Sequence, residues 1–186
     1  KNFPEFKTTS FSIGVSYNPA MHFNNDYLTY TGGSTDFLGF DDGTRALPFD
    51  RNEEIPNEVL NDPKLEDLTR SMTKQLGVEN KMNFMNTSLS FSHGNQKEFD
   101  KFTLGYNAVL NYQNRTEYYK DVTFSSIYLK SQNTATDNLV PEELRTGQLG
   151  QNSVLWSALL TGAIKYNNTE ISASLMRIQN GISKAA

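Results

Sequence analysis

The sequence predicts an all-β fold: a transmembrane antiparallel β-barrel, of which this chain contributes about five or six strands. Several segments alternate between apolar and polar residues with the period of a β-strand. Their polar positions are small and uncharged, whereas a soluble β-sandwich would place Lys and Glu there. The connections between these segments alternate between long and short, as they do in barrels that cross a membrane. We therefore expect residues 1–186 to belong to a single β-barrel domain.

Five segments carry the alternation, and the third is the most regular. They are residues 10–17, 85–93, 101–114, 153–166 and 169–179. In the third segment, KFTLGYNAVLNYQN, one face holds Phe102, Leu104, Tyr106, Ala108, Leu110 and Tyr112. The other face holds Thr, Gly, Asn and Gln, with Val109 as the exception. No run approaches the roughly 18 apolar residues that a transmembrane helix needs, so strands are the predicted spanning elements.

The two faces of these strands are predicted to meet different surroundings. We expect lipid against the apolar face and a polar lumen on the other side. The expected lipid-facing residues are Leu104, Tyr106, Leu110, Trp156, Leu160 and Ile164, and the expected lumen-facing residues are Asn107, Asn111, Ser157 and Thr161. A slip of one residue in register would reverse every assignment.

Aromatic residues recur at a spacing that fits a membrane. Phe102 and Tyr112 lie ten residues apart, and so do Trp156 and Tyr166. Ten residues of a strand tilted by about 40° rise roughly 25 Å, the height of the apolar band of an outer-membrane barrel. We interpret the aromatic pairs as two interfacial girdles. The alternative is that aromatic residues are simply good strand formers.

The connections are predicted to be extracellular loops and periplasmic turns in alternation. The expected long loops are about 18–81 and 115–152, and the expected short turns are about 94–100 and 166–170. The first loop contains a predicted helix, with Asp62 as N-cap, Pro63 at the first helical position and Gly77 near the end. Its apolar stripe of Leu65, Leu68, Met72 and Leu76 is expected to pack within the loop.

Several classes of chemistry are not indicated. The net charge of −4 argues against a nucleic-acid-binding protein. The chain has no cysteine, and His22 and His93 have no partners at metal-ligand spacing. Asp41 and Asp42 beside a glycine are only weak support for a calcium site. We therefore predict no enzyme activity, no cofactor and no metal.

The stretch DFLGFDDGTRALP, residues 36–48, is too polar for a core strand and too rich in Gly and Pro for a helix. It resembles a segment that follows a barrel strand in TonB-dependent outer-membrane receptors of the Bacteroidetes type. The stretches LSFSHGNQ, LGYNAVLNYQNRTEYY and LMRIQNGISKAA resemble parts of the same receptors in the same order. The resemblance spans nearly the whole chain.

The resemblance implies a function and partners. It implies a barrel of about twenty-two strands in the outer membrane of a Gram-negative cell, which imports a nutrient such as a siderophore, glycan or peptide. Energy would come from the TonB complex through a plug domain, and a surface lipoprotein is a further implied partner. No plug is recognisable in residues 1–186, and GISKAA lacks the terminal aromatic of such barrels, so we expect a middle segment of a receptor. The alternative is a soluble or surface β-rich binding or adhesion module without transport.

Residues 36–48 supply the candidate ligand-binding residues Asp41, Asp42 and Arg45. We expect Arg45 to pair with Asp41 or Asp42 at short range. Phe37, Leu38 and Phe40 are expected to pack beneath the loop. A structural anchor is the favoured interpretation of this segment, and direct ligand contact is the alternative.

Overall fold

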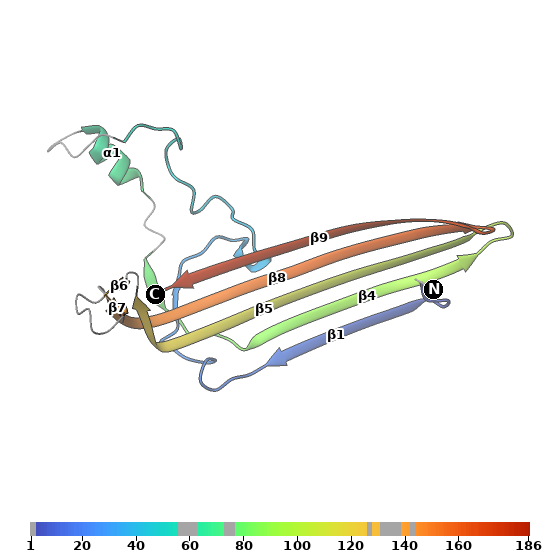
Figure 1. The fold of residues 1–186 in the computed structure, drawn as a ribbon, viewed down its shortest axis with the longest axis horizontal. Coiled ribbons are helices and arrows are strands. Elements are labelled where there is room, and N and C mark those ends of the chain that lie inside the picture. Colours follow the sequence, from blue (N-terminus) through green and yellow to red (C-terminus); the bar gives the residue numbers. More distant parts are fainter. Residues whose placement is uncertain (1–2, 56–62, 73–76, 126–127, 131–138, 142–143) are drawn as a thin grey trace.

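The computed structural model describes residues 3–55, 63–72, 77–125, 128–130, 139–141 and 144–186, and it is mostly antiparallel β-sheet. The main sheet has five strands in the order β1-β4-β5-β8-β9 (Figure 1). Their bounds are β1 Thr8–Ser16, β4 Asn86–Glu98, β5 Thr103–Ser125, β8 Leu144–Tyr166 and β9 Thr169–Ala185. Among the described residues the sheet does not close, because β1 and β9 are both edge strands.

Shorter elements occupy the connections. β2 (Leu28–Tyr30) pairs with β3 (Val78–Asn80), and β6 (Tyr128–Lys130) pairs with β7 (Leu139–Pro141). A 3₁₀ turn, η1, spans Asp36–Leu38, and a helix, α1, spans Pro63–Ser71. No helix within the described ranges is long and apolar enough to cross a membrane.

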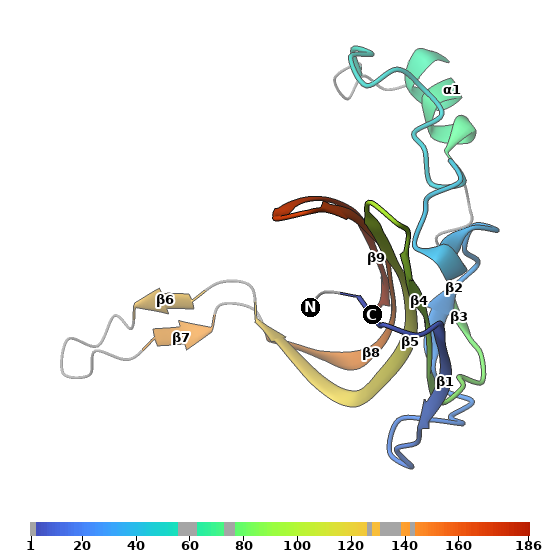
Figure 2. The same ribbon diagram turned by 90° about the vertical axis from the view of Figure 1, so that its right-hand side faces the viewer.

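The main sheet is curved, and its two faces differ. Figure 2 looks along the strands and places the segment with β2, β3 and η1 on the convex side. The strand register aligns side chains into rows across this face, for example Leu89, Tyr112, Trp156 and Gln179. Tyr112 and Trp156 donate hydrogen bonds to η1, so their side chains lie on the convex face. The strand register then places the six residues predicted to face lipid on the convex face, and Asn107, Asn111, Ser157 and Thr161 on the concave face.

Exposed apolar side chains cover the convex face toward the tight turns that join β4 to β5 and β8 to β9. We call this surface the apolar band; it comprises Phe11, Ile13, Leu89, Phe91, Leu104, Tyr106, Leu110, Leu160, Ile164, Ile171 and Leu175. Ile171 and Leu175 each remain 72% exposed. Within the band His93, in the middle of β4, bonds Thr9 Oγ1 at 2.7 Å and the Tyr106 hydroxyl at 3.1 Å.

The predicted ends of the loops and turns need correction. The long loop predicted at 115–152 is largely strand, since β5 continues to Ser125 and β8 begins at Leu144. The sequence analysis missed these extensions because apolar and polar residues no longer alternate regularly along them. The turn predicted at 94–100 lies at Phe99–Phe102, where the Phe99 amide donates to the Phe102 carbonyl at 2.8 Å. The turn predicted at 166–170 is the pair Asn167–Asn168 between β8 and β9.

The helix prediction is right at its start and wrong at its end. α1 begins at Pro63, as predicted, but it ends at Ser71 rather than near Gly77. Asp62 and Leu76 lie outside the described residues, so the N-cap is not described. In the described part of the stripe Leu65 and Leu68 are half-buried, no residue of α1 is fully buried, and Met72 lies beyond the helix end, 47% exposed.

Two glycines let the connecting segment cross the convex face at the end of the strands away from the tight turns. A Cβ at Gly150 of β8 would collide with the backbone carbonyl of Leu28. A Cβ at Gly181 of β9 would lie 2.5 Å from the Cα atom of Gly39. Gly39 itself has a φ of 71°, a left-handed conformation that glycine adopts without steric cost. The backbone therefore lies directly on the sheet.

His22 ties the start of the same segment to the sheet. Its ring is 3% exposed, and Nδ1 accepts a hydrogen bond from the Asn18 amide at 2.9 Å. Because Nδ1 is an acceptor, Nε2 carries the proton and donates toward Asn86 Oδ1 and the Thr116 carbonyl, both at 3.2 Å. These contacts give His22 a structural role where the start of β4 lies beside β5.

The concave face is polar over β1, β4 and β5. Hydrogen bonds between side chains cross it, including Ser10–Ser92 at 2.7 Å and Ser90–Asn111 at 2.8 Å. Over β8 and β9 this face instead exposes Leu155, Met176, Ile178 and Ile182, which the sequence analysis did not predict. The polar surface expected of a lumen is therefore continuous over β1, β4 and β5, whereas over β8 and β9 polar residues such as Ser157 and Thr161 are mixed with exposed apolar ones.

Replacing Gly150 with Ala is expected to lift residues 28–30 off the sheet. The new methyl group would occupy the space of the Leu28 carbonyl, an overpacking that costs roughly 1–3 kcal/mol. Limited proteolysis of residues 18–48 should be faster in Gly150→Ala than in the wild type. The control is Gly147→Ala in the same strand, where the added Cβ would meet its nearest neighbour, Phe124, at 3.9 Å. Equal proteolysis rates for both variants would contradict this account of the crossing.

Candidate functional site

Residues 36–40 are fastened to three neighbouring strands through consecutive carbonyl groups. The Tyr112 hydroxyl of β5 donates to the Phe37 carbonyl at 2.9 Å. The Trp156 indole of β8 donates to the Leu38 carbonyl at 2.8 Å, and the Gln179 amide of β9 donates to the Gly39 carbonyl at 2.7 Å. We call residues 36–40 with these three partners the clamp. The clamp lies in the row of the convex face where the apolar band ends.

Aromatic packing supports the clamp on its strand side. Phe40 meets Trp156 edge to face, with ring centroids 6.0 Å apart. The Arg177 guanidinium lies 5.6 Å from the Phe40 ring and 5.9 Å from the Trp156 ring. Trp156 is therefore on the predicted face but partly covered by protein. The expectation that Phe37 packs beneath the loop is wrong, since Phe37 is 59% exposed, whereas Leu38 and Phe40 are half-buried.

Arg45 pairs mainly with Asp36, a partner that was not expected, and the expected short-range pairing with Asp41 is present as a second, longer contact. The shortest ion-pair contact joins Arg45 Nη2 to Asp36 Oδ2, and a weaker one joins Nη1 to Asp41 Oδ1 at 3.5 Å. The guanidinium also lies over the Tyr30 ring, 5.4 Å from its centroid. The hydrogen bond that Arg45 donates to the Asp36 carboxylate raises the pKa of Arg45, although burial opposes the shift. Asp36 was missed because it precedes the conspicuous Asp-Asp-Gly sequence.

Asp42 holds the turn of this loop together. Its carboxylate accepts hydrogen bonds from the Ser34 amide at 2.7 Å and from the Ser34 hydroxyl at 3.0 Å. It also accepts from the Thr44 amide at 3.1 Å and from the Thr44 hydroxyl at 2.5 Å. The Thr44 hydroxyl, followed by these other donors, holds the pKa of Asp42 well below its usual range. The four acceptor contacts occupy the carboxylate, which leaves it a structural group.

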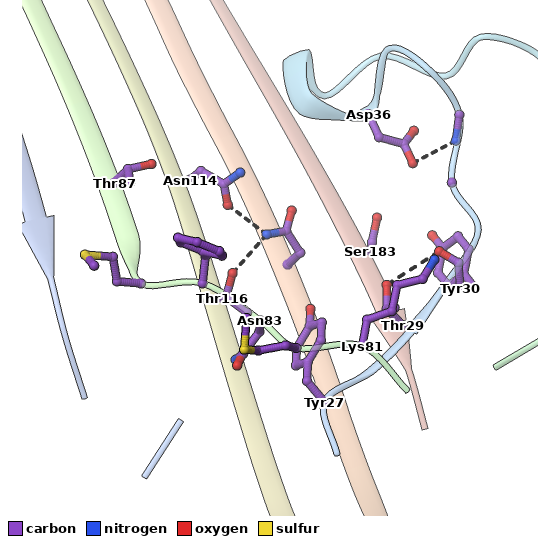
Figure 3. Close-up of a pocket in the computed structure, with 16 residues that line it drawn as sticks. Tyr27, Thr29, Tyr30, Asp36, Lys81, Asn83, Thr87, Asn114, Thr116 and Ser183 are labelled. Atoms are coloured by element: carbon purple, nitrogen blue, oxygen red, sulfur yellow. Dashed lines mark hydrogen bonds between the residues drawn. The ribbon is translucent and has the colours of Figure 1, made fainter. Parts of the chain in front are cut away.

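A cleft of about 500 Å³ lies between the connecting residues that cover the sheet and the part of the convex face beyond the clamp row (Figure 3). Strand residues form one wall, and residues 27–36 and 81–85 form the other. The strand wall comprises Thr87, Asn114, Thr116, Asn152 and Ser183. Asp36 lines this cleft and also a smaller neighbouring cavity of about 210 Å³, in which Asp41 and Arg45 lie.

The opposite wall of the cleft is held in place by hydrogen bonds and ring contacts. Asn83, which is 4% exposed, accepts from the Asn24 amide at 2.8 Å and donates to the Met21 carbonyl at 2.5 Å. The Tyr27 ring packs against Tyr118 with centroids 6.4 Å apart. Burial, and then the nearby Tyr30, raise the pKa of Tyr27 to about 12, so its hydroxyl is protonated at neutral pH. The cleft wall is thus a fixed, largely uncharged surface.

The structure brings the three predicted ligand residues into one loop but gives them different surroundings. Arg45 points to Asp36 and the smaller cavity, Asp41 lies at that cavity's edge, and Asp42 is used by the turn. The sequence analysis did not single out the cleft residues on the strands. Thr116 and Asn152 lie in the predicted loop 115–152, whereas Thr87 and Asn114 lie in predicted strands as isolated polar residues. Within the described ranges, no group of three or more His, Asp or Glu residues could hold a metal ion.

Replacing Arg45 with Ala is expected to loosen the clamp. The Asp36 carboxylate, whose side chain is 27% exposed, would lose its cationic partner at a cost of roughly 1–3 kcal/mol. Exchange of the Gly39 and Phe40 amides, which bond within residues 35–40, should become roughly 5- to 150-fold faster. Asp41→Asn is the matched control, because its contact with Arg45 is longer and its side chain is 58% exposed. Equal effects of the two variants would refute the primary pairing with Asp36.

The titration of Asp42 gives a second test. We expect its carboxyl to titrate below the ordinary Asp value of about 3.9. Because the pKa of Asp42 is lowered in the folded protein, its ionisation stabilises the closed turn at pH values above the ordinary Asp pKa. This contribution is lost as the pH falls through the folded pKa. Thr44→Val should raise the Asp42 pKa more than Ser34→Ala, measured by carboxyl carbon chemical shifts. An unshifted pKa in the wild-type protein would contradict the turn geometry.

Comparison of the chain with models of protein families, with curated proteins and with solved structures found no match in any of the three.

Proposed function

We propose that the chain is a segment of an outer-membrane β-barrel of about twenty-two strands that imports a nutrient, with energy supplied by TonB through a plug domain. The resemblance of residues 36–48 to TonB-dependent receptors suggests the transport function. The fold and its exposed surfaces support the barrel. The substrate class is a siderophore, glycan or peptide, and a surface lipoprotein is a proposed partner at the loops.

The observation that carries the proposal is the apolar band on the convex face. It extends from the tight turns to the clamp row, and Leu110, Leu160 and Ile164 within it are about half exposed. Beyond the clamp row the same face carries Asn114, Thr116 and Asn152 and is covered by the connecting segment. A lipid bilayer requires an exposed apolar surface of limited height between polar rims.

Aromatic residues lie at both limits of the band. Tyr112 and Trp156 pair directly at the clamp row. At the other limit Thr103 pairs with Lys165, and the next residues outward are Phe102 and Tyr166. Such amphipathic rings are enriched where a membrane meets water. Their presence in neighbouring strands at matching levels supports the girdle interpretation over strand propensity alone.

The open edges support membership of a larger sheet. β1 and β9 each present unpaired backbone donors and acceptors on one side. In a membrane every such group must be satisfied within the protein, which closure into a barrel achieves. In water, an apolar surface of this extent would exceed what a monomer normally exposes. The chain alone is therefore expected to aggregate in aqueous buffer.

Site-directed labelling tests the barrel in the complete receptor polypeptide, of which residues 1–186 are proposed to be a segment. Single cysteines carrying a spin label are placed at Leu110 and Leu160 on the convex face and at Asn111 and Thr161 on the concave face. In bilayers, lipid-dissolved oxygen should broaden the first pair, and a water-soluble nickel complex should broaden the second pair. The expected contrast is at least severalfold, because adjacent residues of a strand point to opposite faces.

The controls separate the membrane barrel from the alternative of a soluble binding module. Phe37, an exposed residue of the clamp, serves as the aqueous reference. Labels at Leu110 and Asn111 that respond equally to the water-soluble reagent would refute the barrel. A soluble, monodisperse and cooperatively melting protein of residues 1–186 would favour the binding module instead.

A further inference from the structure

We propose that the cleft and the adjoining apolar band bind one lipid with an uncharged sugar headgroup. The sugar would occupy the cleft, and the acyl chains would lie on the band. This inference rests on the proposed function in one respect, that the band faces lipid. It adds a specific ligand site on the outer surface of the sheet, separate from any transport route on the concave side.

The cleft and the band adjoin on a single strand. Thr87 of β4 lines the cleft. Leu89 and Phe91 follow it on the same face of β4, and they are 41% and 39% exposed. The clamp covers the corresponding row over β8 and β9 through Trp156 and Gln179. The open route from the cleft to the band therefore runs along β4, where a polar headgroup and an apolar chain can bind end to end.

The lining of the cleft favours a ligand with many hydroxyl groups. Asn152 Nδ2 is engaged by Asn114 Oδ1 at 2.7 Å and by Thr116 Oγ1 at 3.2 Å, as Figure 3 shows. Because Asn114 Oδ1 accepts from Asn152, the orientation of the Asn114 amide is fixed, and its nitrogen is the group that can donate to a ligand. The Ser183 and Thr87 hydroxyls line the same space. These hydroxyl and amide groups, beside the rings of Tyr27 and Tyr30, suit a sugar, which has polar edges and apolar C–H faces.

The charges of the cleft disfavour an anionic headgroup. Its lining contains one carboxylate, Asp36, and one ammonium group, Lys81. Arg45 neutralises Asp36, the Gly33 amide donates a hydrogen bond to it, and Glu79 pairs with Lys81 at 2.7 Å. A phosphate would therefore meet no uncommitted cation in the lining and would lose its hydration. The volume of about 500 Å³ falls within the range of small-molecule sites.

Lipid retention by the complete polypeptide tests the proposal. The protein is placed in nanodiscs that contain equal amounts of diglucosyl diacylglycerol, phosphatidylglycerol and phosphatidylcholine with identical acyl chains. Native mass spectrometry after detergent extraction identifies the retained lipid. We expect about tenfold enrichment of the glycolipid, a selectivity that a few fixed hydrogen bonds can supply. Free maltose, which has a sugar but no chains, should compete only weakly.

Two variants fill the cleft from different strands. Ser183→Trp on β9 and Thr87→Trp on β4 should both abolish the enrichment. The matched control is Ser172→Trp on the concave face of β9, which should retain it. A photoreactive glycolipid gives an independent measurement with the wild-type protein, because its headgroup should cross-link to residues 27–30 or 81–85. This second measurement does not depend on the folding of any variant.

The outcomes separate this inference from the proposed function. Equal retention of the three lipids, a preference for phosphatidylglycerol, or cross-links confined to the concave face would overturn the glycolipid site while leaving the barrel intact. Binding of free maltose as tight as that of the glycolipid would also overturn it, since the band would then contribute nothing. Failure of the protein to enter any bilayer would refute the proposed function and, with it, this site.

Discussion

Residues 28–39 cross the convex face in direct backbone contact with the sheet. The arrangement of the other connecting residues at that end of the strands depends on this contact. A strand normally projects side chains that keep other backbones several ångströms away. Gly150 and Gly181 remove that barrier at two places, beneath Leu28 and Gly39. The segment can then lie close enough for Tyr112, Trp156 and Gln179 to donate to its carbonyl groups. Both the clamp and the cleft are consequences of this close approach.

The clamp also marks a change in the chemistry of one sheet face. Toward the tight turns the convex face is apolar and exposed, and beyond the clamp row it is polar and covered. The strands run on without interruption through this boundary, as β5 and β8 show. The same secondary structure therefore serves two surroundings, and side-chain chemistry alone distinguishes them. This division links the proposed membrane surface to the proposed headgroup site directly above it.

Electrostatics act locally in the loop that carries the clamp. Arg45 has its strongest ion pair with Asp36, and Asp42 is held by Ser34 and Thr44. These contacts fix residues 33–45 around η1. Charged residues that are conspicuous in the sequence are thus used mainly to hold the loop, which supports the anchor interpretation of residues 36–48. The adjacent uncharged residues are the ones left available to a ligand.

The sequence by itself determined the β class, the positions of the five main strands and the division of their side chains between two faces. Those properties are local, because a period of two fixes which residues share a face. It did not reveal the extensions of β5 and β8, since polar residues on both faces give no alternation. Only the tertiary structure decided that Arg45 pairs with Asp36, that Phe37 is exposed and that Trp156 supports the clamp. Trp156 and Leu38 are 118 positions apart and meet where the chain crosses over two glycines. Arg45 and Asp36 are only nine positions apart, but their pairing depends on the course of the same loop, which no local pattern encodes.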